Sequence, residues 1–339
     1  MGVLGMEALT LSDYRKRMNP DGSVDFIIEA LERANPIMNH VKWIEGNLPT
    51  GNKTTLRTSI PRPSIRRINQ GIVSHKSTTK QIQDTCMMLE DRSEVDVKLI
   101  RLQPNGEAFR RSEDAAFVAG FGDTVSDMLF YGDTQENPDT FNGLSIRYNI
   151  VGGEKHTAGH QVVAGGTPGT NTNTSAFFVS WGTKATTGIY PKNSQLGLSQ
   201  KDLGEQDALD DKGHPYRALV TLFDMDCGLA VQDIEANALV RNIDVKTLDT
   251  LDSKKSLELI KKFVKAKNTI RNLQNRDKDT HLYVSPALYD FFEIYLLDKT
   301  NVHVTRQDLM NARPQLYFSG IPIEKSDSIL ETEPAFPVA

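Results

Sequence analysis

The 339-residue sequence predicts a mixed α+β protein with one large domain or two ordinary ones. A basic amphipathic helix is expected over 254–276, where apolar residues recur every three or four positions. Residues 56–60 alternate with period two and 176–181 form a short apolar run, which are two patterns typical of strands. No run approaches the ~20 apolar residues that span a bilayer, so a membrane protein is excluded. Two cysteines, Cys86 and Cys227, cannot form a disulfide framework, which indicates a protein made in a reducing cytoplasm.

Charge is strongly segregated along the chain, although the net charge is only −5. Residues 46–83 contain no acid and seven basic residues, whereas 84–139 contain thirteen acids and five bases. A second acidic stretch, 201–235, has nine acids and three bases. Blocks of opposite charge suit a molecule that contacts copies of itself, and a solvated basic loop is the alternative. Nucleic-acid binding is less favoured, because the basic stretch has no aromatic residue on which a base can stack.

The first 83 residues predict an arm followed by a projecting ribbon. Residues 1–45 are expected to form an arm with short helices, one of them over 25–34, which Pro36 ends. Residues 46–83 are expected to form two strands around a turn near Asn69, and the prolines at 61 and 63 exclude a central strand position. A long ribbon with few apolar residues is not stable alone. The sequence therefore predicts an oligomer.

A short helix is expected over 94–102 and a longer one within 105–131, capped near Asn105 or Ser112. Apolar side chains of the longer helix, at 117, 121, 125 and 128, share one face. Gly120 and Gly122 each cost about 1 kcal/mol relative to alanine inside a helix. They therefore predict a close backbone approach or a break.

Loops, strands and helices alternate in the second half of the chain. We expect a loop over 152–175, the strand at 176–181, a strand pair at 217–226 and 229–231, the helix at 254–276, a strand at 281–285, a helix at 287–297 that Ser285 caps, and a last strand at 316–318. The basic face of the 254–276 helix is either solvated or in contact with nucleic acid.

The sequence contains no convincing catalytic motif. His156 and His160 form an HxxxH pattern, but the glutamate that would act as general base is missing, and Gly159 disfavours the helix that would direct both rings at one metal. A metal-dependent hydrolase using this pair is kept as an alternative that metal analysis would test. We expect no catalytic residue, no cofactor and no metal.

An ordered series of segments resembles the major capsid proteins of tailed bacteriophages, particularly those of short-tailed phages. The resemblance covers about residues 80–330 and is carried by DTCMMLEDRSEVDVKL (84–99), AFRRSEDAAFVAGF (108–121), LFYGD (129–133), NPDTFNGLSIRY (137–148), NTSAFFVSWGTKATTGIYPKN (173–193), LSQKDLG (198–204), CGLAVQDIEANALVRNID (227–244), LYVSPALYD (282–290) and YFSGIPIEKSDSI (317–329). At 232–235 the chain has QDIE, where relatives are expected to carry basic residues.

The resemblance implies the Hong Kong 97-type capsid fold, which is an α+β fold. Its parts are expected to be an N-terminal arm (1–45), an extended β-hairpin loop (46–83), a peripheral domain (84–150) with a spine helix at about 105–131, a mainly axial domain (151–310), and a return strand to the peripheral domain with a C-terminal tail (311–339).

The same resemblance implies assembly rather than catalysis. Pentamers and hexamers would build an icosahedral head around double-stranded DNA, assembled in the bacterial cytoplasm. The implied partners are other copies of the chain, a portal protein, a decoration or cement protein, and a scaffolding protein, expected to be separate because nothing like a long scaffolding extension precedes the arm. DNA contact would be nonspecific, and no membrane and no covalent crosslink are expected. The extended loop would lie over a neighbouring subunit, so that Arg57, Arg62, Arg66 and Arg67 face acids such as Glu90, Asp91, Glu94, Glu113 or Asp114. A small oligomeric nucleic-acid-binding protein that uses 53–80 and 254–276 is the other alternative.

Overall fold

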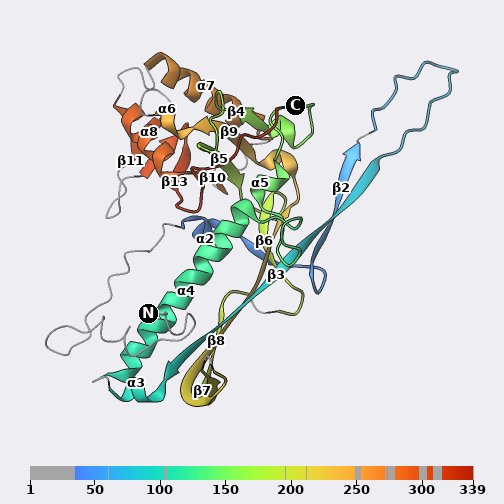
Figure 1. Ribbon diagram of the computed structural model, residues 1–339. Coiled ribbons are helices and arrows are strands. Elements are labelled where there is room, and N and C mark those ends of the chain that lie inside the picture. The colour runs from blue at the N-terminus through green and yellow to red at the C-terminus, as the bar shows by residue number, and fades with distance from the viewer. Residues whose placement is uncertain are drawn as a thin grey trace.

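Two β-sheets and one long helix organise the subunit (Figure 1). The computed structural model describes residues 35–59, 61–102, 105–194, 196–210, 212–248, 253–271, 273, 279–297, 304–307 and 315–338. The helices expected within 1–34 lie outside the described residues. In the part of the chain that is described, no helix has both the length and the apolar character needed to cross a membrane. The α+β class that the sequence predicts is confirmed.

The first sheet is six-stranded and is built on two unusually long strands. It contains β1 (Trp43–Glu45), β2 (Gly51–Ser59), β3 (Thr78–Asp96), β6 (Thr186–Tyr190), β7 (Ser199–Leu209) and β8 (Pro215–Val231). The order is β1-β6-β8-β3-β2, and β7 pairs with β8. The strand pair expected at 217–226 and 229–231 is wrong, because β8 runs through both segments without a turn.

Strand β3 belongs to the ribbon and to the body of the subunit at the same time. Its first part pairs antiparallel with β2, from Thr78 to Thr85, and its second part pairs antiparallel with β8, from Cys86 to Asp96. The expected boundary between the extended loop and the peripheral domain, at 83/84, therefore falls inside one continuous strand. The two expected strands of the ribbon are present as β2 and β3, Asn69 has φ 63° in the turn between them, and the second strand begins at Thr78.

The long helix α4 (Gly106–Tyr131) follows the short helix α3 (Val97–Arg101) and lies along the first sheet (Figure 1). The side chain of Asn105 caps α4 by accepting a hydrogen bond from the amide of Ala108 at 3.2 Å, as the sequence predicts. A buried apolar stripe that includes Phe121 and Val125 faces the sheet.

The two helical glycines do not have the role that the sequence predicts. Gly120 and Gly122 lie in an unbroken helix. A Cβ atom at either position would meet nothing within 4 Å. Neither a break nor a close approach inside the subunit explains them.

The second sheet has seven strands in the order β11-β12-β13-β10-β5-β9-β4. Their bounds are β4 (Val162–Ala164), β5 (Asn173–Ser180), β9 (Ala238–Asp244), β10 (Thr280–Val284), β11 (Val304–Gln307), β12 (Gln315–Phe318) and β13 (Ile321–Lys325). Every residue of β5 is buried. Because side chains alternate along a strand, Phe177 and Val179 pack into the core shared with α4, whereas Ala176 and Phe178 pack into the core around the other helices.

Helices α6 (Val245–Leu248), α7 (Ser253–Thr269) and α8 (Pro286–Leu296) contribute to that second core. Leu259, Phe263 and Ala266 of α7 are buried there, while Lys261 and Lys262 are exposed, so the expected core stripe is confirmed. Ser285 precedes α8 but makes no side-chain cap, and its buried hydroxyl has no hydrogen-bond partner in the described part of the chain. The other short helices that the described residues form are α2 (Ile37–His40), α5 (Leu144–Arg147), and the single turns 159–161 and 234–236.

The last strands, β11, β12 and β13, belong to the second sheet and not to the sheet beside α4. Strand β12 pairs with β11 and with β13. The apolar side chains of β12 and β13 are buried in the core of the second sheet, namely Leu316, Phe318, Ile321 and Ile323. The chain reaches α4 only afterwards, where the amide of Leu330 donates to the Tyr131 hydroxyl at 3.0 Å.

Candidate assembly interface

The projecting ribbon ends in a loop, residues 61–77, whose side chains are exposed along its whole length. Ile65 is 100% exposed and Ile68 is 92% exposed. Between described residues, the hydrogen bonds of this loop are local, for example from Arg66 Nε to the carbonyl of Gln70 at 3.0 Å. Apolar side chains left in water at the tip of a ribbon are typical of a surface that a partner covers.

All four arginines expected at the interface lie on the exposed side of this ribbon. Arg57 is on β2, and Arg62, Arg66 and Arg67 are on the loop. The structure therefore brings the predicted positive charges together with the exposed isoleucines.

A groove of about 450 Å³ lies between β3 and α4. Its lining combines apolar and acidic side chains: Leu89, Glu90, Asp91, Ala116, Phe117, Gly120, Phe121 and Thr124. Glu90 and Asp91, two of the predicted contact residues, are exposed and line the groove. Glu94 is half-buried further along β3, where its Oε1 forms an ion pair with Arg92 Nε at 2.7 Å.

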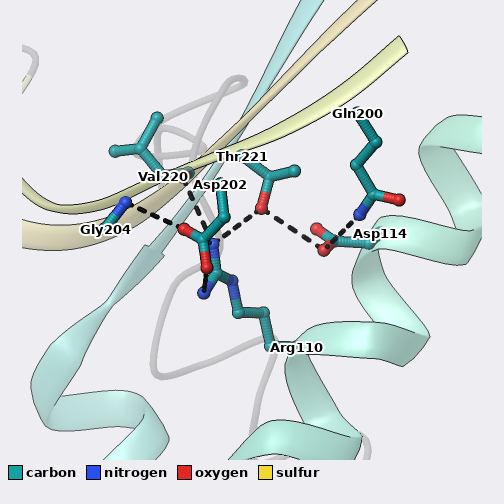
Figure 2. Close-up of polar contacts among 7 residues, drawn as sticks. All are labelled: Arg110, Asp114, Gln200, Asp202, Gly204, Val220 and Thr221. Atoms are coloured by element: carbon teal, nitrogen blue, oxygen red, sulfur yellow. Dashed lines mark hydrogen bonds and ion pairs between the residues drawn. The ribbon is translucent and has the colours of Figure 1, made fainter. Parts of the chain in front are cut away.

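The other two predicted acids are used inside the subunit, which corrects their assignment as surface contacts. Glu113 and Asp114 are each only 8% exposed on the face of α4 that packs against the sheet. Asp114 Oδ2 accepts hydrogen bonds from Gln200 Nε2 at 3.2 Å and from the Thr221 hydroxyl at 3.3 Å (Figure 2). Helical spacing alone did not show that this face is covered by β7 and β8.

Arg110, one helical turn before Asp114, connects α4 to the hairpin formed by β7 and β8. Its guanidinium donates to both carboxylate oxygens of Asp202, at 3.0 and 2.7 Å, and to Thr221 and the carbonyl of Val220 (Figure 2). The hydrogen bonds from Arg110 lower the pKa of Asp202. Sequence reasoning missed this role, because nothing in the sequence pairs Arg110 with a strand 92 residues away.

The base of the ribbon is held by a buried ion pair. Asp84 Oδ1 lies 2.7 Å from Arg147 Nη2, and the same guanidinium group donates to the carbonyl of Leu229 at 2.9 Å. Burial raises the pKa of Asp84, and the adjacent Arg147 opposes that rise. The pair connects β3, α5 and β8 at the point where the ribbon leaves the body.

A second buried network fixes the C-terminal segment. Arg241 is fully buried, donates to the carbonyl and hydroxyl of Ser145 at 2.9 and 2.8 Å, and lies over the Phe336 ring at 3.7 Å. Glu333 accepts hydrogen bonds from the Tyr131 hydroxyl at 2.6 Å and from Ser175. Burial raises the pKa of Glu333, although Arg241 opposes the rise, and burial lowers the pKa of Arg241 to about 10.

The HxxxH pair does not form a metal-binding cluster among the described residues. His156 Nδ1 lies 2.5 Å from Glu235, which also pairs with Arg271 Nε at 3.0 Å. Asp233 binds the same guanidinium at 3.2 Å. The acids of the QDIE segment therefore serve contacts inside the subunit.

Comparison with known proteins gives a consistent result. The family described as Major capsid protein GP7 matches residues 19–337. No curated protein matches the chain. A near-atomic resolution structure of bacteriophage Epsilon15 is similar with a TM-score of 0.74 and 25% identity, over 100% of both chains. The capsid of bacteriophage JBD30 shares the fold, with a TM-score of 0.54 and 14% identity over 89% of this chain and 93% of that one.

The family match spans far more than half of the sequence, and the similar structures are phage particles with the Hong Kong 97-type fold that the resemblance implies. This places the protein in the shell of a virion. The chain belongs to the major capsid protein GP7 family and is a phage capsid shell protein.

Proposed function

We propose that the subunit assembles into pentamers and hexamers of an icosahedral head that encloses double-stranded DNA, and that each ribbon lies in the groove of a neighbouring subunit. The observation that carries this proposal is the ribbon loop 61–77, which presents fully exposed isoleucines among arginines. The groove between β3 and α4 offers the complementary surface, with Phe117 and Leu89 beside Glu90 and Asp91.

The two kinds of side chain contribute differently to this contact. Burying an isoleucine fully is worth roughly 1.5–3 kcal/mol, so Ile65 and Ile68 supply most of the affinity. An exposed ion pair contributes about 0–1 kcal/mol, so the arginines and acids mainly set the register and exclude wrong partners. A weak contact of this kind is sufficient, because every subunit of a closed shell makes several.

The contact is heterologous, since a ribbon on one subunit meets a groove on the next. Heterologous contacts close into rings when the rotation between subunits allows it. Rings of five and six copies then build the shell in the proposed assembly. Scaffolding, portal and decoration proteins are the proposed further partners, and the proposed DNA contact is nonspecific and weakens with salt.

Charge reversal tests the proposed pairing. The variant Arg66→Glu/Arg67→Glu and the variant Glu90→Arg/Asp91→Arg should each reduce shell formation, and combining them should restore it, as measured by sedimentation and negative-stain electron microscopy. Lys262→Glu, an exposed change on α7, is the control and should assemble normally. If the four-residue variant that combines both changes assembles no better than the ribbon variant or the groove variant alone, the proposed pairing is wrong.

A further inference from the structure

Three side chains from distant parts of the sequence meet on one face of the second sheet. His281 lies on β10, and Glu324 lies on β13 opposite Tyr283 in the parallel register. Because side chains alternate along a strand, His281, Tyr283 and Glu324 point to the same side. His40, the last residue of α2, lies over this face.

The potential ligand atoms of the three residues are close together. His281 Nδ1 is 3.5 Å and His40 Nε2 is 3.9 Å from the same oxygen of Glu324. One ligand atom from each residue lies within 4.8 Å of the others, and this is the one such cluster of histidine, cysteine and acidic residues among the described parts of the chain. All three side chains are largely buried, with exposed fractions of 24%, 15% and 17% for His40, His281 and Glu324.

The hydrogen bonds around the cluster leave the ring nitrogens available. His281 Nδ1 is buried and has no hydrogen-bond partner among the residues that the structure describes. His40 Nδ1 lies 3.1 Å from the Tyr283 hydroxyl, which accepts a hydrogen bond from Trp181 Nε1 at 2.9 Å. When His40 donates through Nδ1 to Tyr283, its Nε2 is unprotonated and faces Glu324, as in metal sites whose histidines are oriented by an outer hydrogen bond.

We propose that His40 Nε2, His281 Nδ1 and Glu324 bind a divalent transition metal ion, with Zn²⁺ the best fit to two imidazoles and one carboxylate. Zinc commonly takes such a donor set, with water as the fourth ligand. The rings now stack at 3.8 Å with an angle of 18° between their planes. A metal lies in the plane of each imidazole that binds it, so one ring turns when the ion enters. The bound ion connects α2, through His40, to strands β10 and β13 of the second sheet.

Zinc titration of the purified full-length protein, stripped of metal with a chelator, tests the site. We expect one Zn²⁺ per chain by calorimetry and an increase in melting temperature on adding zinc. His281→Asn and Glu324→Gln should each weaken binding by at least about tenfold and remove the thermal shift. His156→Ala is the matched control: it removes another histidine–glutamate pair, which is more exposed, and should bind zinc like the wild type.

The outcomes separate clearly. Loss of the bound ion in both cluster variants, with circular dichroism like the wild type, supports the site. No zinc binding by the wild type, or binding that survives in His281→Asn and Glu324→Gln, overturns it. Loss of zinc in His156→Ala alone would place the ion on that surface pair and also overturns the proposal.

Discussion

Arg110 belongs to α4, yet its guanidinium contacts only the β7–β8 hairpin in the hydrogen bonds drawn in Figure 2. Hydrogen bonds to a charged group contribute more than neutral ones, and the partners left behind lose theirs. We therefore expect Arg110→Ala to lower the free energy of unfolding by about 1–3 kcal/mol in urea denaturation.

The neighbouring residue provides the control. Arg111 pairs with Glu107 at 3.3 Å, and both side chains are more than three-quarters exposed, at 79% and 87%. Arg111→Ala should change the free energy of unfolding by less than about 0.5 kcal/mol. Equal losses for the two variants would contradict the role given to the Arg110 network.

Glu333 gives the subunit a pH dependence at the scale of one residue. Burial raises the pKa of Glu333 from 4.5, so the folded state binds more protons than the unfolded state at pH values between 4.5 and the raised pKa. Protonation of Glu333 therefore stabilises the folded state fully below pH 4.5, and this stabilisation is lost as the pH rises through the raised pKa. In Glu333→Gln this contribution is absent.

The measurement is the difference in free energy of unfolding between the wild type and Glu333→Gln at several pH values. We expect this difference, wild type minus variant, to fall as the pH rises from 4.5. A difference that stays constant or rises over that window would show that the pKa of Glu333 is not raised in the folded protein.

Among elements, α4 contains two glycines that the folded subunit does not need. The structure offers room for a Cβ at Gly120 and at Gly122. Each change to alanine should therefore raise the free energy of unfolding by about 1 kcal/mol in chemical denaturation. A loss of stability in either variant would contradict the finding that a Cβ atom fits at these two positions.

Gly120 differs from Gly122 in that it lines the groove. Gly120→Leu should fill part of the proposed ribbon site and reduce shell formation, whereas Gly122→Leu should leave assembly closer to normal. Sedimentation of the assembly mixtures distinguishes the two. Equal assembly by both variants would argue that the groove is not used.

The ribbon is the element whose removal should separate folding from assembly. Replacing residues 62–73 with a two-residue turn leaves the buried pair Asp84–Arg147 and the β3–β8 pairing intact. We expect the melting temperature to stay within a few degrees of the wild type while shells fail to form. A large drop in melting temperature would mean that the ribbon stabilises its own subunit.

Elements with strong local signals were predictable from the sequence. The cap at Asn105, the apolar stripe of α7 and the alternation in β2 each depend on neighbours within a few residues. Strand β8 was predicted as two pieces, because its continuity comes from pairing with β3 and β7, which no local pattern records. The burial of Glu113 and Asp114 was missed for the same reason.

At the scale of the whole molecule, sheet membership was the least predictable feature. The segment 186–231 returns to the first sheet and 315–325 stays in the second, and both outcomes depend on long-range packing. The cluster of His40, His281 and Glu324 likewise forms only when three distant segments fold together. By contrast, the basic ribbon and the acidic stretch that contributes Glu90 and Asp91 to the groove were visible as blocks of charge in the sequence.

Cryo-electron microscopy of assembled particles would show where the ribbon of each subunit lies. We expect the loop 61–77 to lie in the groove between β3 and α4 of the neighbouring subunit, with Ile65 or Ile68 within about 4.5 Å of the apolar lining. We also expect arginine density beside Glu90 and Asp91. Particles in which this groove is empty, or in which the loop folds back on its own subunit, would show that the ribbon does not bind there.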